Sequence, residues 1–265
     1  MKSNLLYIGY YLPDELIKEV SNEIEHNFSI GRQKFETKLI DNLFQSEDIN
    51  LNVITYYPSS KKVNIKNSIF NENLITHIGL QKRNIFSYFR GLIRFTKMFK
   101  TSYKHKENID VLMYAVNPVF LIPLLVFRLF NRNITIHSIV SELPHYRRFN
   151  KKLSSNIKKN LLIYFNKKFD GYILFSEHMK HLLPEKKFIV VEGMSSGEFQ
   201  TPYFPKKNIV MYAGGLAKDN NIELLIDTCS QLNIVDEVWI CGKGDNDYIS
   251  KFIGNHSKIK YLGKL

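Results

Sequence analysis

Short apolar runs rich in β-branched residues alternate with amphipathic stretches along almost the whole of this 265-residue chain. This alternation is typical of an α/β protein with a mostly parallel sheet, because parallel strands need a crossover, usually a helix, between them. The runs that we expect to form strands lie at 5–12, 50–58, 74–80, 109–116, 133–140, 171–176 and 187–193. The pattern therefore predicts an α/β fold.

A second unit of the same kind begins after the segment TPYFPKKN at 201–208, where two prolines interrupt the pattern. Strand patterns follow at 209–213, 237–242 and 259–263, and helical patterns lie between them at 221–232 and 246–254. We expect a first domain at 1–200, a linker at 201–207 and a second unit at 208–265. A doubly wound nucleotide-binding domain has strands on both sides of its first strand. The run at 209–213 would therefore form a bare sheet edge, and we expect the second domain to be truncated.

The chain is basic, with 37 Lys and Arg against 25 Asp and Glu, and nearly all of the net charge of +12 lies in the first 200 residues. Residues 81–106 and 147–168 each hold eight basic side chains and no acidic one. In the first stretch one helical face can carry Arg90, Arg94, Lys97 and Lys104, and another can carry Ile85, Phe89, Leu92 and Phe95 or Phe99. This composition favours a helix on an anionic membrane surface. A core-packed helix with a solvated basic back is the alternative.

The sequence also bears on three further questions: a nucleic-acid partner, a membrane span and the cellular compartment. We expect no nucleic-acid partner, because the sequence has no zinc-ligand spacing, aromatic RNP motif or defensible helix-turn-helix. The apolar stretch at 111–130 has the length of a membrane span, but Pro118 and Pro123 interrupt it, so we expect a buried strand followed by a helix. Only Cys229 and Cys241 are present, which favours the reducing cytoplasm over a disulfide framework or a metal site.

Two strand ends carry candidate site residues. Gly214 and Gly215 separate a strand pattern from a helical one, a device that holds phosphate when freed N–H groups point at the anion. Lys218 would add a nearby charge, although many such turns bind nothing. Glu142 and His145 follow the strand at 133–140, and ligands in open α/β sheets bind beyond such strand ends. We therefore expect both to contact an acceptor hydroxyl.

The later motif CGKGDND at 241–247 has two glycines of a dinucleotide fingerprint, but its third position is Asp247, which argues against NAD.

The motifs YIGYYLP, IVSELPHY, GYILFSEHMKHLL, VVEGM, YAGGL, ICGKGD and YLG occur in an order that resembles bacterial GT-B glycosyltransferases of family 4, especially those of capsule and exopolysaccharide assembly. The resemblance implies two Rossmann-like domains, an acceptor domain followed by a nucleotide-sugar domain. It implies a retaining enzyme that needs no metal or cofactor and uses a nucleotide sugar, with a UDP-sugar as the expected donor.

Carried over by position, Gly214 and Gly215 match the glycine turn beside the donor diphosphate, and Glu142 stands where many relatives have an aspartate facing the cleft. Glu192 and Gly193 match an Asn-Gly pair at the domain junction. The chain departs from the family by having Gly215 and Asn220 where relatives have Arg and Lys, and the family's Glu-x7-Glu element lies beyond Leu265.

The function that we expect from the sequence is transfer of a sugar to a glycan or lipid-linked acceptor at the inner face of the membrane, in cell-surface polysaccharide synthesis. We expect the present form to be inactive, or to depend on a missing half. The alternative is a non-catalytic acceptor domain that binds a membrane or a separately encoded donor-domain chain, with the strand at 209–213 as its docking edge.

Overall fold

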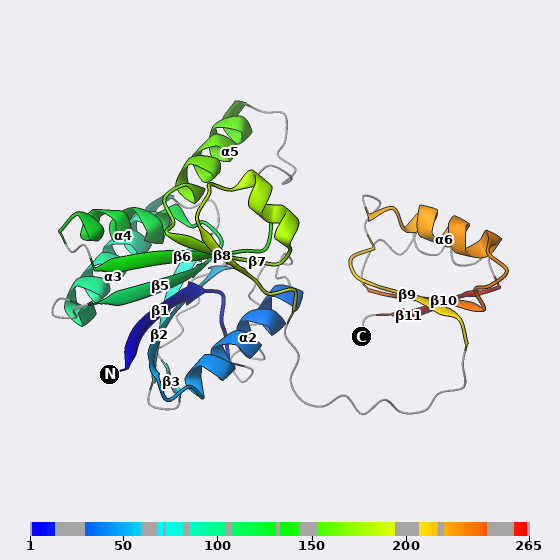
Figure 1. Cartoon of the computed structure of the whole chain (residues 1–265), viewed down its shortest axis with the longest axis horizontal. Helices are drawn as coiled ribbons and strands as arrows, with labels where there is room; N and C mark the ends of the chain where they lie inside the picture. Colours follow the sequence, from blue (N-terminus) through cyan, green and yellow to red (C-terminus); the bar gives the residue numbers. More distant parts are fainter. Residues whose placement is uncertain are drawn as a thin grey trace. The chain divides into compact units, whose positions relative to one another are not determined.

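The computed structural model describes residues 2–13, 30–59, 68–70, 73–81, 85–103, 108–130, 133–143, 153–193, 207–216, 220–242 and 257–263. The chain divides into two compact units, Met1–Gly197 and Glu198–Leu265, called unit 1 and unit 2 here. Each unit has its own sheet (Figure 1). Most of the expected linker, at 201–206, and the whole of the expected helix at 246–254 lie outside the described residues.

Unit 1 is built on an eight-stranded sheet in the order β3-β4-β2-β1-β5-β6-β7-β8. Every pairing in it is parallel except that of β3 with β4. The strands are β1 (Ser3–Gly9), β2 (Ile49–Ser59), β3 (Ser68–Phe70), β4 (Asn73–Gln81), β5 (Ile109–Tyr114), β6 (Ile134–Val140), β7 (Gly171–Leu174) and β8 (Lys187–Val190). All seven strands expected in this part of the sequence are present, and only the short β3 was not expected.

Helices cover both faces of this sheet (Figure 1). One face carries α2 (Ile30–Phe44), and the other carries α3 (Ile85–Tyr103), α4 (Pro118–Phe130) and α5 (Leu153–Asn166), with the 3₁₀ helix η1 (Glu177–Leu182) between β7 and β8. Because alternate side chains of a strand point to opposite faces, Tyr7 packs beneath α2 with Ile40, whereas Leu6 and Ile8 pack beneath α3 and α4. The unit is therefore a three-layer, doubly wound α/β structure.

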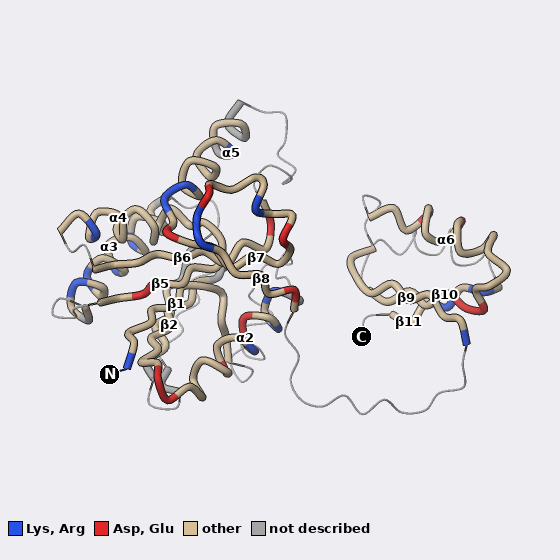
Figure 2. Tube along the Cα trace, viewed as in Figure 1, with Lys and Arg blue, Asp and Glu red and all other residues tan. Residues whose placement is uncertain are grey.

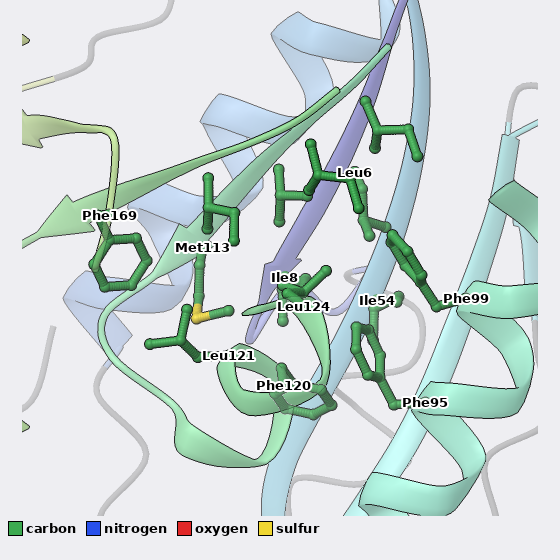
Figure 3. Packing of buried hydrophobic residues seen from close by; sticks show 14 of the residues in the cluster. Leu6, Ile8, Ile54, Phe95, Phe99, Met113, Phe120, Leu121, Leu124 and Phe169 are labelled. Atoms are coloured by element: carbon green, nitrogen blue, oxygen red, sulfur yellow. The ribbon is translucent and has the colours of Figure 1, made fainter. Parts of the chain in front are cut away.

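Aromatic rings join α3 and α4 to the sheet in a continuous core (Figure 3). The ring of Phe120 in α4 lies 4.8 Å from that of Tyr56 in β2 and 5.2 Å from that of Phe95 in α3. Phe99, one turn further along α3, lies 4.9 Å from Phe127 of α4. Edge-to-face and tilted ring pairs at these separations are favourable, and they fix the two helices against each other.

The segment 111–130 is a strand followed by a helix, as its prolines predicted. Strand β5 ends at Tyr114, and α4 begins at Pro118 with the side-chain oxygen of Asn117 accepting a hydrogen bond from the N–H of Val119. Among the described helices, none is both long and apolar enough to cross a bilayer. Cys229 and Cys241 are buried free thiols, in agreement with a chain without disulfides.

Unit 2 has a three-stranded parallel sheet in the order β11-β10-β9, from β9 (Ile209–Ala213), β10 (Glu237–Cys241) and β11 (Ile259–Gly263). Helix α6 (Ile222–Gln231) covers one face and buries Ile222 and Ile226 against Val238 and Ile240. Within the described sheet β9 is hydrogen-bonded only to β10. The expected edge position of the run at 209–213 is confirmed.

Candidate functional site

The point where the strand order of unit 1 reverses lies between β1 and β5, because the chain runs outward from β1 to β2 and then returns on its other side to β5. In open parallel sheets, ligands bind beyond the carboxyl ends of the strands at such a point. The strands β1, β5, β6 and β8 end on this same edge, called the carboxyl edge of unit 1 here. It carries Glu142, Glu192 and Gly193, three of the site residues expected in this unit.

Glu142 lies two residues beyond β6 on this edge, and its side chain is exposed. Glu192 and Gly193 lie just beyond β8 on the same edge and are also exposed. A Cβ added to Gly193 would meet no atom within 4 Å, so space around it does not demand glycine. His145 lies outside the described residues. The structure therefore places three of the four residues on the expected edge, and their roles stay predictions.

A cluster that the sequence did not reveal lies at the reversal point: Tyr7, Tyr10, Arg32, Glu36 and Tyr114, called the Arg32 cluster here. The guanidinium carbon of Arg32 lies 3.5 Å from the ring centroid of Tyr10, just after β1, and 3.9 Å from that of Tyr114, the last residue of β5. Its Nε donates to an oxygen of Glu36 at 2.6 Å. The arginine is thus held between two rings, where cation–π attraction adds to the ion pair.

Glu36 is fully buried, and its second oxygen accepts hydrogen bonds from the Tyr7 hydroxyl at 2.6 Å and from the backbone N–H of Tyr10. Gly9 makes this approach possible, because a Cβ there would come within 2.2 Å of the Glu36 carboxylate and 2.5 Å of the Tyr7 ring. The carboxylate therefore ties the first turns of α2 to the carboxyl end of β1.

The charges in the cluster shift one another's pKa values. Burial raises the pKa of Glu36, and the neighbouring Arg32 guanidinium and Tyr7 hydroxyl oppose this rise. Burial alone would lower the pKa of Arg32, but the attraction of Glu36 keeps it above its ordinary value. Burial and then the charge of Glu36 raise the pKa of Tyr7. The tyrosine therefore stays neutral, and its hydroxyl donates a hydrogen bond to the carboxylate.

The backbone beside this cluster is strained. Ala115, which follows the last residue of β5, has φ of 59°, in the left-handed region that costs a residue with a Cβ about 1–3 kcal/mol. Burial raises the pKa of Tyr114, and the side chain of Ser141, which precedes Glu142, opposes this rise. The Arg32 cluster therefore lies near the segment that carries the predicted acceptor contact.

Sequence reasoning missed Arg32 and Glu36 because their spacing is that of an ordinary pair on the surface of a helix. The one available signal was Gly9 at the end of an apolar strand, flanked by tyrosines at positions 7 and 10.

In unit 2 all three strands end at glycine: Gly214 follows β9, Gly242 follows β10, and Gly263 ends β11. The N–H of Gly214 donates to the carbonyl of Cys241 at 3.0 Å, and that of Gly242 donates to the carbonyl of Gly263 at 2.8 Å. These residues form the glycine edge of unit 2. Such an edge lets a ligand approach the backbone closely.

The turn after β9 is held from within. The carbonyl oxygen of Gly215 accepts hydrogen bonds from the Tyr212 hydroxyl at 3.0 Å and from the side-chain amide of Asn220. These two exposed hydrogen bonds fix the orientation of the carbonyl within the turn. Lys218 lies outside the described residues, so its expected role in the turn stays a prediction.

The outer faces of α3, α4 and α5, called the outer helical layer here, combine basic and large apolar side chains. Arg90, Arg94 and Lys97 are exposed on α3, as predicted, while Lys104 lies outside the described residues. The three helices contain no Asp or Glu (Figure 2). Exposed large apolar side chains lie among the basic ones: Phe86, Phe89 and Ile93 on α3, Ile122, Val126, Leu129 and Phe130 on α4, and Ile157, Leu161 and Tyr164 on α5.

The prediction that Phe89 shares one face of α3 with Phe95 and Phe99 is wrong. Phe95 and Phe99 are buried, but Phe89 is 59% exposed. At about 100° per residue, Phe89 lies about 120° around the helix from Phe95, and the buried arc is centred on Phe95 and Phe99. Phe89 therefore belongs to the outward face, beside Arg90.

A cavity of about 340 Å³ lies elsewhere in unit 1 and is lined in part by Tyr172, Lys180 and Phe188. Of the charged residues that line it, Lys180 is paired with Glu177 at 2.6 Å. Within the described ranges, no group of three or more His, Cys, Asp or Glu side chains is arranged to hold a metal ion.

No protein-family model matches the sequence, and no curated protein matches it. Solved structures do match. Sucrose-phosphate synthase from Thermosynechococcus elongatus superposes on 100% of this chain and 71% of its own, with a TM-score of 0.64 and 11% identity. The α,α-trehalose 6-phosphate synthase from Burkholderia multivorans matches 100% of this chain and 73% of its own, with a TM-score of 0.58 and 8% identity.

Anabaena HepE, solved in complex with UDP and glucose, matches 99% of this chain and 70% of its own, with a TM-score of 0.54 and 12% identity. These neighbours are glycosyltransferases of GT-B architecture. At such identities the likeness establishes the fold: a parallel-sheet, Rossmann-like α/β structure of the GT-B kind, as the resemblance in the motifs implied.

Proposed function

We propose that the chain is a glycosyltransferase of family 4 that transfers a sugar from a nucleotide sugar to a glycan or lipid-linked acceptor in cell-surface polysaccharide synthesis, with retention at the anomeric carbon. The observation that carries this proposal is the glycine edge of unit 2 within a GT-B fold. Two bound substrates are needed for transfer, and the two units offer one carboxyl edge each.

Unit 2 is the donor side. Gly214 and Gly215 bring backbone without side chains to this edge, and hydrogen bonds to the carbonyl of Gly215 hold the turn, which suits it to a diphosphate. A UDP-sugar is the proposed donor, which agrees with the UDP and glucose bound to HepE. Holding the charge of the departing diphosphate is the largest catalytic task in such a transfer, and Lys218 is the proposed cation. No metal or cofactor takes part in the proposed reaction.

Unit 1 is the acceptor side. Glu142 is exposed beyond β6, on the carboxyl edge of unit 1. We assign Glu142 and His145 to the acceptor hydroxyl, whose orientation toward the donor sugar supplies much of the rate. Glu192 and Gly193 are assigned to the junction between the domains.

The outer helical layer is the proposed contact with the inner face of the membrane. Its side chains are apolar and cationic, with Phe86, Leu129 and Phe130 respectively 70%, 79% and 85% exposed. Exposed apolar surface of this extent marks an interaction site. Because α3, α4 and α5 contain basic but no acidic side chains, the layer complements the negative charge of an anionic bilayer. A lipid-linked acceptor would be displayed at that surface.

Nucleotide binding tests the donor assignment. Titration of UDP, GDP and UDP-glucose by calorimetry should show millimolar or tighter binding of one nucleotide. Gly215→Val should abolish it, because a Cβ at Gly215 meets only Asn220, at 3.4 Å, and its branches would fill the space for phosphate. Ile234→Val is the control, since Ile234 is 71% exposed and precedes β10, at the opposite end of that strand from the glycine edge. Equal binding by both variants would reject the glycine edge as the donor site.

The second candidate function is a non-catalytic acceptor domain that docks a separate donor-domain chain. The edge position of β9 favours it, together with the 52% exposure of Met211 on that strand. An added strand would pair with the free side of β9. Hydrogen exchange of the β9 amides should then slow when such a chain is added, and unchanged exchange with a bound chain would exclude β9 as the docking edge.

A further inference from the structure

We propose that the cavity of about 340 Å³ in unit 1, called the η1 cavity here, binds a small organic anion that joins a flat apolar body to a phosphate or carboxylate group. Its lining residues come from β7, from η1 and the segment that follows it, and from β8. The cavity is separate from the residues expected at the carboxyl edge, because Lys186 and Phe188 lie at the start of β8 whereas Glu192 and Gly193 follow its end. This inference does not rest on the proposed function.

The apolar part of the cavity lies on the face of the sheet that carries α3, α4 and α5. Tyr172 and Leu174 of β7 belong to the core beneath those helices, and Leu183 packs against the same core. Phe188 is the register partner of Tyr172, so its side chain points to the same face. Tyr172 and Leu174 are buried, so the apolar surface that a ligand can reach is that of Phe188, which is 40% exposed, and of the half-buried Leu183 and Pro184.

The volume of the η1 cavity fits a ring that carries a charged substituent. An apolar cavity of about 150 Å³ is enough to hold benzene, and ligand sites in proteins begin at about 300 Å³. A cavity of about 340 Å³ therefore holds one aromatic ring and has room for an anionic group. Phe188 offers the ring a partly exposed aromatic partner, and contacts between aromatic rings add to the gain from burial.

The charged side chains of the lining favour an anion. Lys180, His181 and Lys186 line the cavity together with one carboxylate, that of Glu185. The Nζ of Lys180 lies 5.9 Å from the centroid of the Phe188 ring. A cation therefore stands beside the apolar surface, at the distance that a ring with a short anionic substituent would span.

The existing contact of Lys180 leaves it able to bind an anion. Its Nζ lies 2.6 Å from an oxygen of Glu177, in a pair whose side chains are 37% and 66% exposed. Such an exposed pair contributes little to stability, and an ammonium group has three donors, of which this contact uses one. Lys186 is held more firmly, since its Nζ donates to the carbonyls of Lys167 and Phe169. Lys180 is therefore the anion contact, and Lys186 adds a fixed positive charge.

Calorimetric titration of the full chain with phenyl phosphate, phenylacetate, benzyl alcohol and inorganic phosphate tests this inference. We expect at least one of the two aromatic anions to bind at least about 10-fold more tightly than benzyl alcohol and inorganic phosphate, because burial of the ring and a charge-assisted hydrogen bond each contribute roughly that factor. The more tightly bound of the two identifies the anion as phosphate or carboxylate. Binding of neither, or equally tight binding of benzyl alcohol or inorganic phosphate, would overturn the proposal.

The same titrations with UDP present separate this site from the proposed donor site. Binding in the η1 cavity should be unchanged by UDP, whereas displacement of the aromatic anion by UDP would place that anion in unit 2 and overturn the proposal. Absence of UDP binding would reject the proposed donor site without changing this result.

Two pairs of variants locate the site. Phe188→Ala should weaken binding of the aromatic anion at least about 10-fold, whereas Ile189→Ala, 59% exposed on the opposite face of β8, should leave it unchanged. Lys180→Gln should weaken it at least about 10-fold, whereas Lys187→Gln removes the same charge from that opposite face and should not. Thermal unfolding shows which variants fold. Parent-like binding by folded Lys180→Gln, or equal weakening in either control, would exclude the η1 cavity as the site.

Discussion

The Cα of Gly242 lies against the carbonyl oxygen of Gly214, so closely that a Cβ at position 242 would stand 1.8 Å from that oxygen. Gly242 also has φ of 147°, a conformation that side chains of L-residues rarely adopt. The ends of β9 and β10 can therefore meet only if this residue is glycine. The contact lies within the glycine edge, where the donor is proposed to bind.

Gly242→Ala is expected to destabilise unit 2 by about 2–4 kcal/mol, from backbone strain and overpacking together. Trp239 in β10 is the only tryptophan of the chain, so its fluorescence during urea unfolding reports on unit 2 alone. Gly215→Ala, in the same unit and with only Asn220 near an added Cβ, at 3.4 Å, should leave the unfolding midpoint unchanged. A Gly242→Ala protein as stable as the parent would show that β9 and β10 do not meet in this way.

The carboxylate of Glu237 in β10 makes the stability of unit 2 depend on pH. It accepts hydrogen bonds from Lys260 at 2.9 Å, Trp239 Nε1 at 2.8 Å and Lys207 at 3.1 Å, and these lower its pKa to about 2. The folded pKa lies below the ordinary value of 4.5, so the unfolded chain binds the proton first as pH falls. The stabilisation of unit 2 by the Glu237 carboxylate is present above about pH 4.5 and is lost between pH 4.5 and about pH 2.

Urea unfolding followed by Trp239 at pH 6, 4 and 2.5 measures this loss. In Glu237→Gln the decrease over that window should be smaller, and high salt should weaken the effect in the parent because the lysines are exposed. An identical pH dependence in parent and variant would remove Glu237 as its cause.

His77 in β4 makes the stability of unit 1 depend on pH over a different range. Burial and then the charge of Arg94 lower its pKa from 6.5 to about 4. Since the unfolded histidine gains its proton at a higher pH than the folded one, stability is full above about 6.5 and falls as pH drops toward 4. The loss amounts to about 3 kcal/mol if the whole shift is expressed.

His77→Leu should flatten this dependence, which far-UV circular dichroism of urea unfolding at pH 4.5 and 7 would detect. His178 in η1 is exposed and serves as the control position, so His178→Leu should keep the dependence of the parent. If both variants retain the full slope, the pH sensitivity of unit 1 has another origin.

The sequence predicts much of the fold because the strands of a parallel sheet are buried on both faces and therefore stand out as apolar runs. Strand β5 and helix α4 were separable because Pro118 and Pro123 exclude a single continuous element. The glycine edge was visible in part, since Gly214 and Gly215 interrupt a strand and a helix. These are local signals, and each needs only its neighbours in sequence.

The Arg32 cluster was not predictable in the same way. Arg32 and Glu36 come from α2, Tyr10 from the end of β1, and Tyr114 from the end of β5, 82 residues beyond Arg32. Only the return of the chain past β1 brings them together, and the sequence pattern of each element is satisfied without that contact. The predicted apolar face of α3 was wrong at Phe89 for a related reason. Phe86, Phe89 and Ile93 make the helix apolar on more than one side, so its sequence pattern does not single out the buried face.

The outer helical layer is expected to bind vesicles that contain anionic lipid. Replacing Arg90, Lys97 and Lys100 together by Gln should weaken binding roughly 100-fold, at about 1 kcal/mol for each charge near the surface. Arg94 is left unchanged because it also acts on the pKa of His77. Replacing Leu129 and Phe130 together by Ser should weaken binding without changing the charge, since both side chains are exposed at the end of α4.

Co-sedimentation with vesicles of neutral and of 30% anionic composition, roughly the range over which surface charge matters, separates the two contributions. The matched control replaces Lys2, Lys34 and Lys38 by Gln. It removes the same charge from the residue before β1 and from α2, on the opposite face of the sheet. Binding that falls equally in this control would mean that net charge alone attracts the chain. Binding that falls only in the two layer variants would locate the membrane contact on α3 and α4, and it would leave the carboxyl edge of unit 1 to receive an acceptor from that surface.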